Sequence, residues 1–206
     1  MFITLEGPEG SGKTTAVDFA VKALEEKGYQ IVRTREPGGT PIAEQIRNII
    51  LDKENTKMDP RTEALLYAAS RRQHLVEKVW PALKEGKIVV CDRYLDSSLA
   101  YQGGARGLGI ENILNINMFA TENTWPDLTL LFDIKPEIGL ARIASNSNRE
   151  VNRLDLEKLE FHNKVRDTFL ELAKRYPERF VIIDASKSRE EVAHATLEAI
   201  LSRLCK

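Results

Sequence analysis

The glycine-rich segment 7–14, GPEGSGKT, carries the clearest chemistry in the sequence, because it fits the pattern G-x-x-x-x-G-K-[ST] at every fixed position. Its glycines let the backbone bend tightly and bring N–H groups close to an anion without an intervening Cβ atom. Lys13 can reach the outer phosphates of a nucleoside triphosphate, and the Thr14 hydroxyl can coordinate magnesium. A helix that begins near Lys13 would direct the positive end of its dipole at the same anion. The segment therefore predicts a phosphate-binding loop.

An acid that completes a magnesium site is expected at the end of a strand, and three apolar runs end in aspartate, at Asp92, Asp133 and Asp184. We favour Asp92 because Arg93 follows it at once, and a carboxylate for metal beside a guanidinium for phosphate suits a site where both meet. The predicted metal ligands are Thr14 and Asp92. An ordinary ion pair at a strand end is the alternative interpretation, and the sequence leaves open whether the acid binds the ion directly or through water.

A guanine-nucleotide switch is disfavoured by the rest of the chain. Residues 56–59, TKMD, superficially fit the guanine-reading motif, but they lie between two helical segments instead of after a strand. In addition, no aspartate is followed three residues later by glycine, so the D-x-x-G switch element is missing. We interpret residues 56–59 as the entry to a helix.

The loop must be positioned by the elements around it, and apolar β-rich runs alternate with helical patterns along the chain. Strands are predicted from Phe2 up to the loop and at 29–34, 87–92, 128–134 and 180–184. Helices are predicted at 13–27, up to about 51, at 60–84 with a kink at Pro81, at 110–121, from 136, at 155–175 and at 189–204. This alternation predicts an α/β fold with a parallel sheet covered on both faces. Segment 94–109 contains four glycines and is predicted as a loop or helix end that wraps a ligand, and the polar segment 145–152 as a lid.

Composition bounds the remaining possibilities. A chain of 206 residues favours one domain, and a net charge of −1 gives no global attraction to nucleic acid or to a membrane. Cys91 and Cys205 have no metal-type or redox spacing, and no segment has the character of a leader or a membrane span, so a cytoplasmic location is favoured. The histidines at 74, 162 and 194 are interpreted as surface or packing residues.

Several arginine-bearing segments together carry a resemblance. They are TREPGGT at 34–40, YAASRR at 67–72, DRYLDSSLAYQG at 92–103 and NRLD at 152–155. With the phosphate-binding loop, and in this order, they make the sequence similar to bacterial thymidylate kinase over nearly its whole length. The resemblance implies a P-loop nucleoside monophosphate kinase fold over residues 1–206, with a five-stranded parallel sheet, helices on both faces and a short lid at about 145–155.

The implied activity is transfer of the γ-phosphoryl group of ATP to dTMP, which gives dTDP in dTTP biosynthesis and requires Mg²⁺. Members of this family are usually homodimers, and neither nucleic acid nor a membrane is an expected partner. Two rivals stay open from the residues alone. One is a kinase for another nucleotide or small metabolite, and the other is an ATP-dependent switch.

The resemblance also implies site residues. The ATP-binding residues would be Gly7, Pro8, Glu9, Gly10, Ser11, Gly12, Lys13, Thr14, Thr15 and Arg142, the last as a platform for adenine. The dTMP-binding residues would be Glu9, Glu36, Pro37, Arg47, Tyr67, Arg71, Arg93, Ser98, Tyr101, Gln102 and Arg106. Among these, Glu9 matches a contact to the 3′-hydroxyl, Arg47 and Arg93 match acceptor-phosphate ligands, and Arg71 and Gln102 match readers of the thymine edge. Tyr67 would stack on the base, and Tyr101 would lie near the 2′ carbon.

Two positions depart from the family pattern. Tyr67 stands where phenylalanine is more usual, which adds a hydroxyl that needs a partner. Gly10 stands where some relatives carry an arginine in the phosphate-binding loop, so the resemblance is to the subgroup whose catalytic arginine lies in the lid. Arg149 and Arg153 are the candidates. The predicted catalytic residues are therefore Lys13, Arg93, Arg149 and Arg153.

Overall fold

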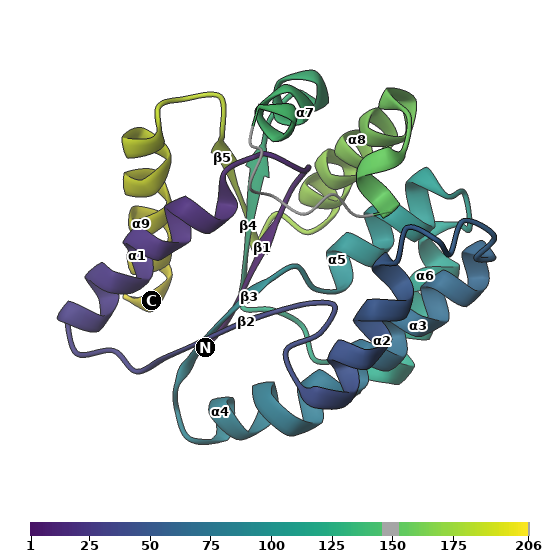
Figure 1. The fold of residues 1–206 in the computed structure, drawn as a ribbon. Helices are drawn as coiled ribbons and strands as arrows, with labels where there is room; N and C mark the ends of the chain where they lie inside the picture. Colours follow the sequence, from purple (N-terminus) through teal and green to yellow (C-terminus); the bar gives the residue numbers. More distant parts are fainter. Residues whose placement is uncertain (146–152, 206) are drawn as a thin grey trace.

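The protein is built on a five-stranded, all-parallel sheet with the strand order β2-β3-β1-β4-β5 (Figure 1). The structure is a computed structural model that describes residues 1–145 and 153–205. The strands are β1 (Phe2–Glu6), β2 (Ile31–Arg35), β3 (Ile88–Asp92), β4 (Leu128–Asp133) and β5 (Phe180–Asp184). Each predicted strand is present within a few residues of its expected position. The predicted α/β architecture is confirmed.

The central strand positions the phosphate-binding loop. Every residue of β1 is buried, as expected for a parallel strand covered on both faces. Its neighbours are β3 on one side, where Leu5 is paired with Asp92, and β4 on the other, where Glu6 is paired with Leu131. The chain order reverses at β1, and ligands of open α/β sheets bind at such a reversal, outside the carboxyl ends of the strands. The loop after β1 and the residues after β3 therefore meet at this edge.

Helices cover both faces of the sheet. They are α1 (Lys13–Glu26), α2 (Pro41–Leu51), α3 (Pro60–His74), α4 (Trp80–Lys84), α5 (Leu95–Ser98), α6 (Ile110–Thr121), α7 (Pro136–Ala144), α8 (Leu159–Arg175) and α9 (Arg189–Leu204). Helices α1 and α9 pack together over one face, where Val17, Leu24 and Ile200 join the buried cluster of β1 and β4. Helices α3, α5, α6 and α8 belong to the other face, where Phe169 and Leu172 are part of the larger cluster (Figure 1).

Segment 94–109, predicted as a loop or helix end, is mostly helical, so the helix-end alternative is confirmed and the loop alternative was wrong. Helix α5 continues into a π-helical segment, Leu99–Ala105. The glycines there allow close packing rather than an open loop, since a Cβ atom on Gly104 would lie 2.1 Å from the Thr168 hydroxyl of α8. A second π-helical segment, Leu75–Val79, links α3 to α4 and puts the irregularity just before Pro81, where a kink was predicted.

The predicted lid falls largely outside the described residues. Segment 146–152, which includes Arg149, is not described, so its role stays a prediction. After it the chain forms a short 3₁₀ helix, Arg153–Leu156, and α8 begins at Leu159 instead of at 155. Over the described part of the chain, no helix combines the length and apolarity that would be needed to cross a bilayer.

Candidate active site

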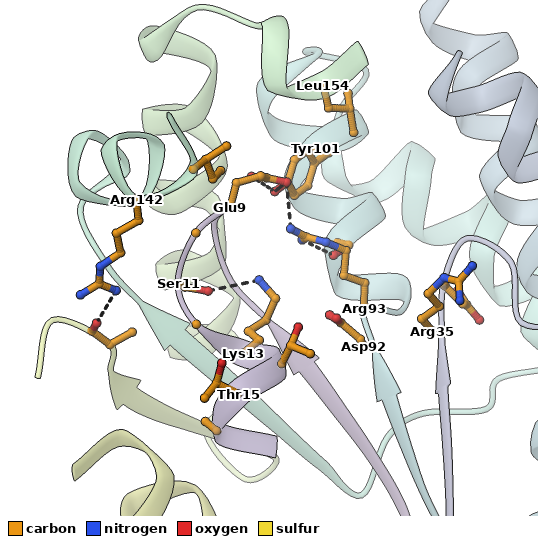
Figure 2. A pocket seen from close by; sticks show the side chains of 18 of the residues that line it. Glu9, Ser11, Lys13, Thr15, Arg35, Asp92, Arg93, Tyr101, Arg142 and Leu154 are labelled. Atoms are coloured by element: carbon orange, nitrogen blue, oxygen red, sulfur yellow. Dashed lines mark hydrogen bonds and ion pairs between the residues drawn. The ribbon is translucent and has the colours of Figure 1, made fainter. Parts of the chain in front are cut away.

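A polar cavity of about 830 Å³ opens at the carboxyl edge of the sheet (Figure 2). It brings together most of the residues predicted from the sequence. Those that line it are Glu9, Gly10, Ser11, Gly12, Lys13, Thr14, Thr15, Glu36, Pro37, Arg47, Tyr67, Arg71, Asp92, Arg93, Ser98, Tyr101, Gln102 and Arg142. The cavity also contains Arg35, Ser97, Lys187 and Arg189, for which the sequence analysis proposed no role.

The phosphate-binding loop has the backbone that its glycines permit. Gly10 and Gly12 have φ angles of 69° and 80°, in the left-handed region that favours glycine. Lys13 folds back over the loop, and its Nζ donates to the carbonyl oxygens of Gly7 and Pro8 at 3.1 and 3.0 Å and to Ser11 Oγ at 3.2 Å. Burial, together with the charge of Arg93, lowers the pKa of Lys13 to about 8. An anion in the loop would favour the charged lysine.

Asp92 has the character of a metal ligand. Its Oδ1 atom is buried and has no hydrogen-bond partner among the described residues. The two rival acids are committed elsewhere, because Asp133 forms an ion pair with Arg166 and Asp184 accepts hydrogen bonds from Ser186. Asp92 and Thr14 both line the cavity, and a carboxylate with a hydroxyl is an oxygen donor set that suits Mg²⁺. The two residues therefore fit the ion.

Glu9 and Arg93 form an ion pair inside the cavity. Arg93 Nη2 donates to Glu9 Oε1 at 2.9 Å, and the Tyr101 hydroxyl lies 2.7 and 2.6 Å from the two carboxylate oxygens of Glu9 (Figure 2). Burial alone would raise the pKa of Glu9, but the charges of Arg93 and Lys13 and the bond from Tyr101 bring it below its ordinary value. An ionised acid, a guanidinium and a phenol thus share one small region next to the loop.

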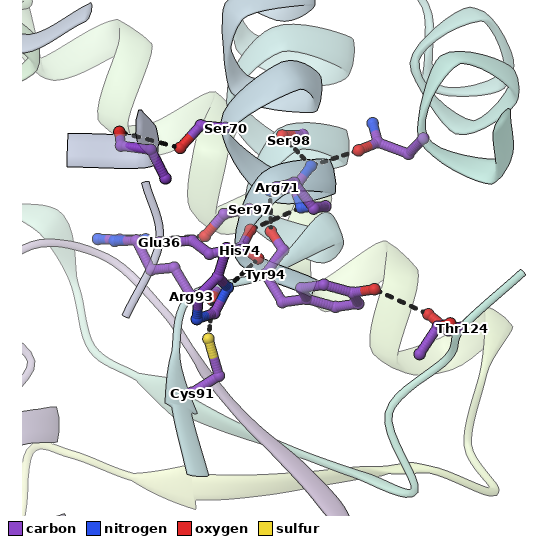
Figure 3. A network of polar contacts seen from close by, with 12 residues as sticks. Glu36, Ser70, Arg71, His74, Cys91, Arg93, Tyr94, Ser97, Ser98 and Thr124 are labelled. Carbon is purple, nitrogen blue, oxygen red and sulfur yellow. Dashed lines mark hydrogen bonds and ion pairs between the residues drawn. The ribbon is translucent and has the colours of Figure 1, made fainter. Parts of the chain in front are cut away.

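A buried network holds the Arg71 guanidinium in one orientation (Figure 3). Its Nε donates to Glu36 Oε2 at 2.7 Å, its Nη1 to Ser98 Oγ at 3.0 Å and to Asn117 Oδ1, and its Nη2 to the Tyr94 carbonyl at 2.9 Å. A guanidinium has five N–H groups. Within the part of the chain that the structure describes, the network uses four of them and leaves one hydrogen on Nη2 for a ligand.

The same network reaches further than the sequence indicated. Glu36 also contacts His74, whose Nδ1 lies 2.9 Å from Oε1 and whose Nε2 hydrogen-bonds Thr34. Glu36, His74 and Cys91 lie close enough together to hold a metal ion, but Glu36 already binds the Arg71 cation, so we interpret the group as part of the network. Asn117 and His74 are members of this network that the sequence did not indicate, because their partners Arg71 and Glu36 lie 46 and 38 residues away in the chain.

Arg47 and Tyr67, two of the residues predicted to bind the acceptor nucleotide, also line the cavity. Arg47 Nη1 donates to the Pro37 carbonyl oxygen at 2.8 Å, which holds the arginine along the loop between β2 and α2. Tyr67 of α3 is buried against the cavity, and burial raises the pKa of its hydroxyl well beyond the neutral range, so the hydroxyl stays protonated. The ring and the hydroxyl are both available on this wall.

The opposite end of the cavity is cationic. Arg142 of α7 donates from Nη1 to the Ala185 carbonyl oxygen at 3.2 Å, which ties α7 to the segment after β5 (Figure 2). Lys187 and Arg189 line the cavity beside it. The same cavity is lined by the phosphate-binding loop and by Arg71 and Tyr67, and Lys13, Asp92 and Arg93 also face it.

Some predicted residues do not line the cavity. Gly7 and Pro8 accept hydrogen bonds from Lys13 through their carbonyl oxygens, and a Cβ atom on Gly7 would lie 2.4 Å from the Phe132 carbonyl oxygen. Arg106 pairs with Glu63 and Glu157, and Arg153 pairs with Glu63 and donates to the Ile50 carbonyl oxygen. Their guanidinium groups therefore contact protein in this conformation, and any role toward a ligand stays a prediction.

Comparison with known proteins agrees with this geometry. A sequence model of the family described as thymidylate kinase matches residues 5–196. A thymidylate kinase of Bacillus velezensis is 60% identical over all of this chain and 97% of its own length, and one of Clostridium novyi is 60% identical over 93% of each chain. One of Bacillus anthracis is 52% identical over 99% of this chain and 98% of its own.

The chain belongs to the thymidylate kinase family. The resemblance carried by the separated arginine-bearing segments is thereby confirmed. The buried acid Glu63, which contacts Gln102, Arg106 and Arg153, is a further residue of this thymidylate kinase fold that the sequence analysis did not single out.

Proposed function

We propose that this protein transfers the γ-phosphoryl group of ATP to dTMP, which gives dTDP and ADP. The observation that carries the proposal is the single cavity in which a phosphate-binding loop faces an ion-paired Glu9 and Arg93. ATP would bind against the loop and Arg142, and dTMP against Arg71 and Tyr67, which line the same cavity. Family membership supports the same acceptor.

The reaction needs no strong general base, because the attacking group is already a phosphate anion. The obstacle is the repulsion between two polyanions, which fixed positive charge and in-line positioning overcome. Lys13 would neutralise the donor phosphates, and Arg93 would lie against the transferring group or the acceptor phosphate. Arg47, at the far wall of the cavity, would hold the acceptor phosphate from the other side. Each of these cations comes from a different element, so their convergence depends on the whole fold.

Magnesium would be held by Thr14 and Asp92. The buried, unpartnered oxygen of Asp92 supports this assignment. When bound, the ion neutralises charge on the donor phosphates. Lys13 provides the remaining charge compensation from within the loop. Asp133 and Asp184, the other two acids at strand ends, are less suited to bind magnesium because their carboxylate oxygens contact Arg166 and Ser186.

Acceptor recognition would combine stacking with two polar contacts. Tyr67 would stack on the thymine ring, while the remaining N–H of Arg71 and the amide of Gln102 would contact its edge. Glu9 would accept from the 3′-hydroxyl, and the Tyr101 ring beside it would exclude a 2′-hydroxyl, so a deoxyribonucleotide is preferred. Ser98, Glu36 and Pro37 would complete the wall, with Arg106 behind it.

The lid arginines are proposed as catalytic groups that act after substrate binding. Closure of the segment around residue 149 would bring Arg149 or Arg153 to the transferring phosphoryl group and exclude water. In this proposal Arg153 leaves Glu63 when the lid closes. Arg149→Ala or Arg153→Ala would lower kcat strongly with a smaller change in dTMP binding, and near-normal turnover in both variants would contradict the assignment.

A homodimer is supported by an exposed apolar face. Ile42 and Ile49 of α2, Leu65 of α3 and Phe119 of α6 are exposed, and Phe119 reaches 90%. Helices α2 and α3 pack together, as do α3 and α6, so the elements that carry these side chains are neighbours (Figure 1). Exposed apolar side chains on neighbouring helices suit a protein interface. Sedimentation of the wild type and of a Phe119→Glu variant tests this, and a monomeric wild type would contradict it.

The cytoplasm is the compartment we propose. The thiols of Cys91 and Cys205 are unpaired, as is usual in a reducing compartment. Both proposed substrates would be drawn from the soluble nucleotide pool, and no nucleic acid or membrane partner is needed.

The decisive experiment is a coupled assay of ADP release with ATP and Mg²⁺, with and without dTMP. Turnover that depends on dTMP supports the proposal. Turnover that depends on another nucleotide but not on dTMP would indicate a different acceptor, and slow hydrolysis without any acceptor would indicate a switch. Because one methyl group in an apolar pocket contributes only about 1–3 kcal/mol, dUMP should be used detectably, whereas dCMP should be rejected more strongly.

A further inference from the structure

Glu63 is a buried acid that none of the proposed roles uses. It lies in the first turn of α3, its side chain is 1% exposed, and three groups donate to it. Gln102 Nε2 donates to its Oε1 at 2.8 Å, Arg106 donates from Nη2 at 3.3 Å, and Arg153 forms a short ion pair with Oε2. Glu63 is not part of the cavity lining, whereas Gln102 is. It therefore stands directly behind a residue that faces the ligand.

The carboxylate of Glu63 is held in its ionised form. Burial would raise its pKa, but the hydrogen bonds from Gln102 and Arg153 and the charge of Arg106 bring it below its ordinary value. An ionised carboxylate can only accept hydrogen bonds. The amide of Gln102 must therefore turn its nitrogen toward Glu63, and the assignment of its nitrogen and oxygen follows from this partner.

This orientation has a consequence for the ligand. The NH2 group of an amide carries two hydrogens and its carbonyl oxygen accepts, and one of the two hydrogens is donated to Glu63. Because the nitrogen is turned toward Glu63, which lies behind the cavity lining, the carbonyl oxygen is the end of the amide left to face a ligand. We propose that Glu63 is a positioning residue that fixes Gln102 as a hydrogen-bond acceptor toward the base, and that it thereby selects a pyrimidine with an N–H at its ring edge. This inference rests on the proposed function, because it assigns Gln102 to the acceptor nucleotide.

The pairing of acceptor and donor matches thymine in particular. Thymine offers an N3–H donor beside a carbonyl acceptor, which suit the Gln102 oxygen and the remaining N–H of Arg71. Cytosine offers an unprotonated N3 acceptor beside an amino donor, so both contacts would be repulsive. Each base reader is backed by its own buried acid, Arg71 by Glu36 at 2.7 Å and Gln102 by Glu63 at 2.8 Å. Sites that leave polar groups unpaired with the wrong ligand discriminate strongly.

The test compares dTMP and dCMP as acceptors in the ADP-release assay. In Glu63→Gln, the amide at position 63 can donate as well as accept, so Gln102 can turn over and present its nitrogen to the cavity. We expect the ratio of kcat/KM for dTMP to that for dCMP to fall by about tenfold or more, mainly through a higher KM for dTMP. A change of ratio within about twofold, in a variant that melts near the wild-type temperature, would overturn the proposal.

A matched control separates base reading from the ion pairs of Glu63. Glu157 pairs with Arg106 at 2.7 Å but has no recorded contact to Gln102 among the described residues. Glu157→Gln should therefore leave the ratio unchanged. An equal loss of discrimination in Glu157→Gln would show that Arg106, and not Gln102, transmits the effect, and would also overturn the proposal.

An exchanged pair keeps the proposal testable if Glu63→Gln alone does not fold. The double variant Glu63→Gln with Gln102→Glu retains one carboxylate and one amide at the same two positions. Its amide donates from position 63, so position 102 still presents an acceptor to the cavity. We expect its preference for dTMP over dCMP to stay within about threefold of the wild type, and loss of that preference would overturn the proposal. Absence of any dTMP-dependent ADP release by the wild type would instead refute the proposed function itself.

Discussion

Arg93 Nη2 lies 2.9 Å from Glu9 Oε1, which joins the residue after β3 to the loop after β1. Arg93 has a φ angle of 67°, a left-handed conformation that residues other than glycine rarely adopt. Its Nη1 also donates to Ser97 Oγ at 3.1 Å, and Ser97 in turn donates to Glu6. The guanidinium is thus held by two contacts from different segments before any phosphate arrives. Such preorganisation is what stabilises a charged transition state at low cost.

Replacement of Arg93 should be the most damaging single change on the acceptor side. We expect Arg93→Ala to lower kcat/KM for dTMP by about 10³-fold or more, which is the range for an arginine at a transferring phosphoryl group. Arg93→Lys should recover only a small part of this loss, because an ammonium has no planar fork to contact Glu9, Ser97 and a phosphate together. Steady-state kinetics with both substrates varied measures the effect.

The control for Arg93 is Arg175→Ala. Arg175 is exposed and pairs with Glu111 on the surface, where an ion pair contributes little. Its activity should stay close to that of the wild type. Full activity of Arg93→Lys would contradict the need for a planar guanidinium at this position and would show that a positive charge is sufficient.

Lys13 should make ATP use sensitive to pH. Burial and the neighbouring Arg93 lower its pKa to about 8 in the ligand-free protein, so the lysine loses its proton as the pH rises through that value. A neutral lysine attracts phosphate less, and kcat/KM for ATP should therefore fall above about pH 8. The free energy of unfolding should rise over the same pH range in which kcat/KM for ATP falls. The lysine of the unfolded chain keeps its proton up to about pH 10.5, so folding becomes more favourable as the pH rises from about 8 to about 10.5.

The variant Lys13→Arg separates the titration of Lys13 from other contributions to the pH dependence of kcat/KM for ATP. Arginine stays charged across the range, so the alkaline fall in kcat/KM for ATP should disappear even if the overall rate is lower. Rates measured from about pH 6.5 to about pH 9.5 decide the matter. A fall that persists in Lys13→Arg would assign the titration to another group.

The sequence was sufficient for the sheet and for the residues next to the phosphate-binding loop. Each strand is an apolar run whose end is marked by a charged residue or a turn, and such local patterns survive folding. The loop motif fixes its own backbone, and Asp92 and Arg93, chosen because they adjoin at a strand end, both line the cavity beside it, while the metal-binding role of Asp92 stays a proposal. Local spacing therefore carried the prediction wherever the functional residues are neighbours in the chain.

The buried networks could not be predicted in this way. Glu63 lies 39 residues from Gln102, and Arg71 lies 46 residues from Asn117, so neither pair has a local pattern. The sequence left a loop and a helix end open for the π-helical segment Leu99–Ala105, because glycines usually indicate a loop, whereas Gly104 is needed there for close contact with Thr168. Tertiary packing overrode local propensity at that segment.

Glu6 should make stability fall as the pH rises through the neutral range. Burial, with the nearby charge of Asp96, raises its pKa from 4.5 to about 8. Between these values the folded protein holds a proton that the unfolded chain releases, so the free energy of unfolding decreases with pH and levels off above about 8. One such proton contributes at most about 1.4 kcal/mol per pH unit.

Glu6→Gln should remove this slope, because glutamine stays neutral and can still accept from the Tyr94 N–H, which lies 2.8 Å from Oε1. Urea unfolding at a series of pH values compares the two proteins. Glu160→Gln, on the exposed end of α8, is the control and should keep the wild-type slope. A Glu6→Gln variant with an unchanged slope would show that another group binds the proton.

Gly10 should tolerate no side chain, since a Cβ atom there would lie 2.1 Å from the Gly139 carbonyl oxygen of α7. We expect Gly10→Ala to destabilise the protein by about 1–3 kcal/mol and to raise KM for ATP, because the loop or α7 must shift. Gly139→Ala makes the same contact from the other side, at 2.2 Å from the Glu9 carbonyl oxygen, and should have a similar effect.

Gly28→Ala is the control, because Gly28 also has a positive φ of 90° but a Cβ atom there would meet no atom within 4 Å. It should cost only the backbone strain and leave KM for ATP unchanged. If Gly10→Ala and Gly28→Ala had the same stability and the same KM for ATP, the contact with α7 would not be the reason that position 10 has no side chain. The fold could then accommodate an arginine at position 10, as in some relatives.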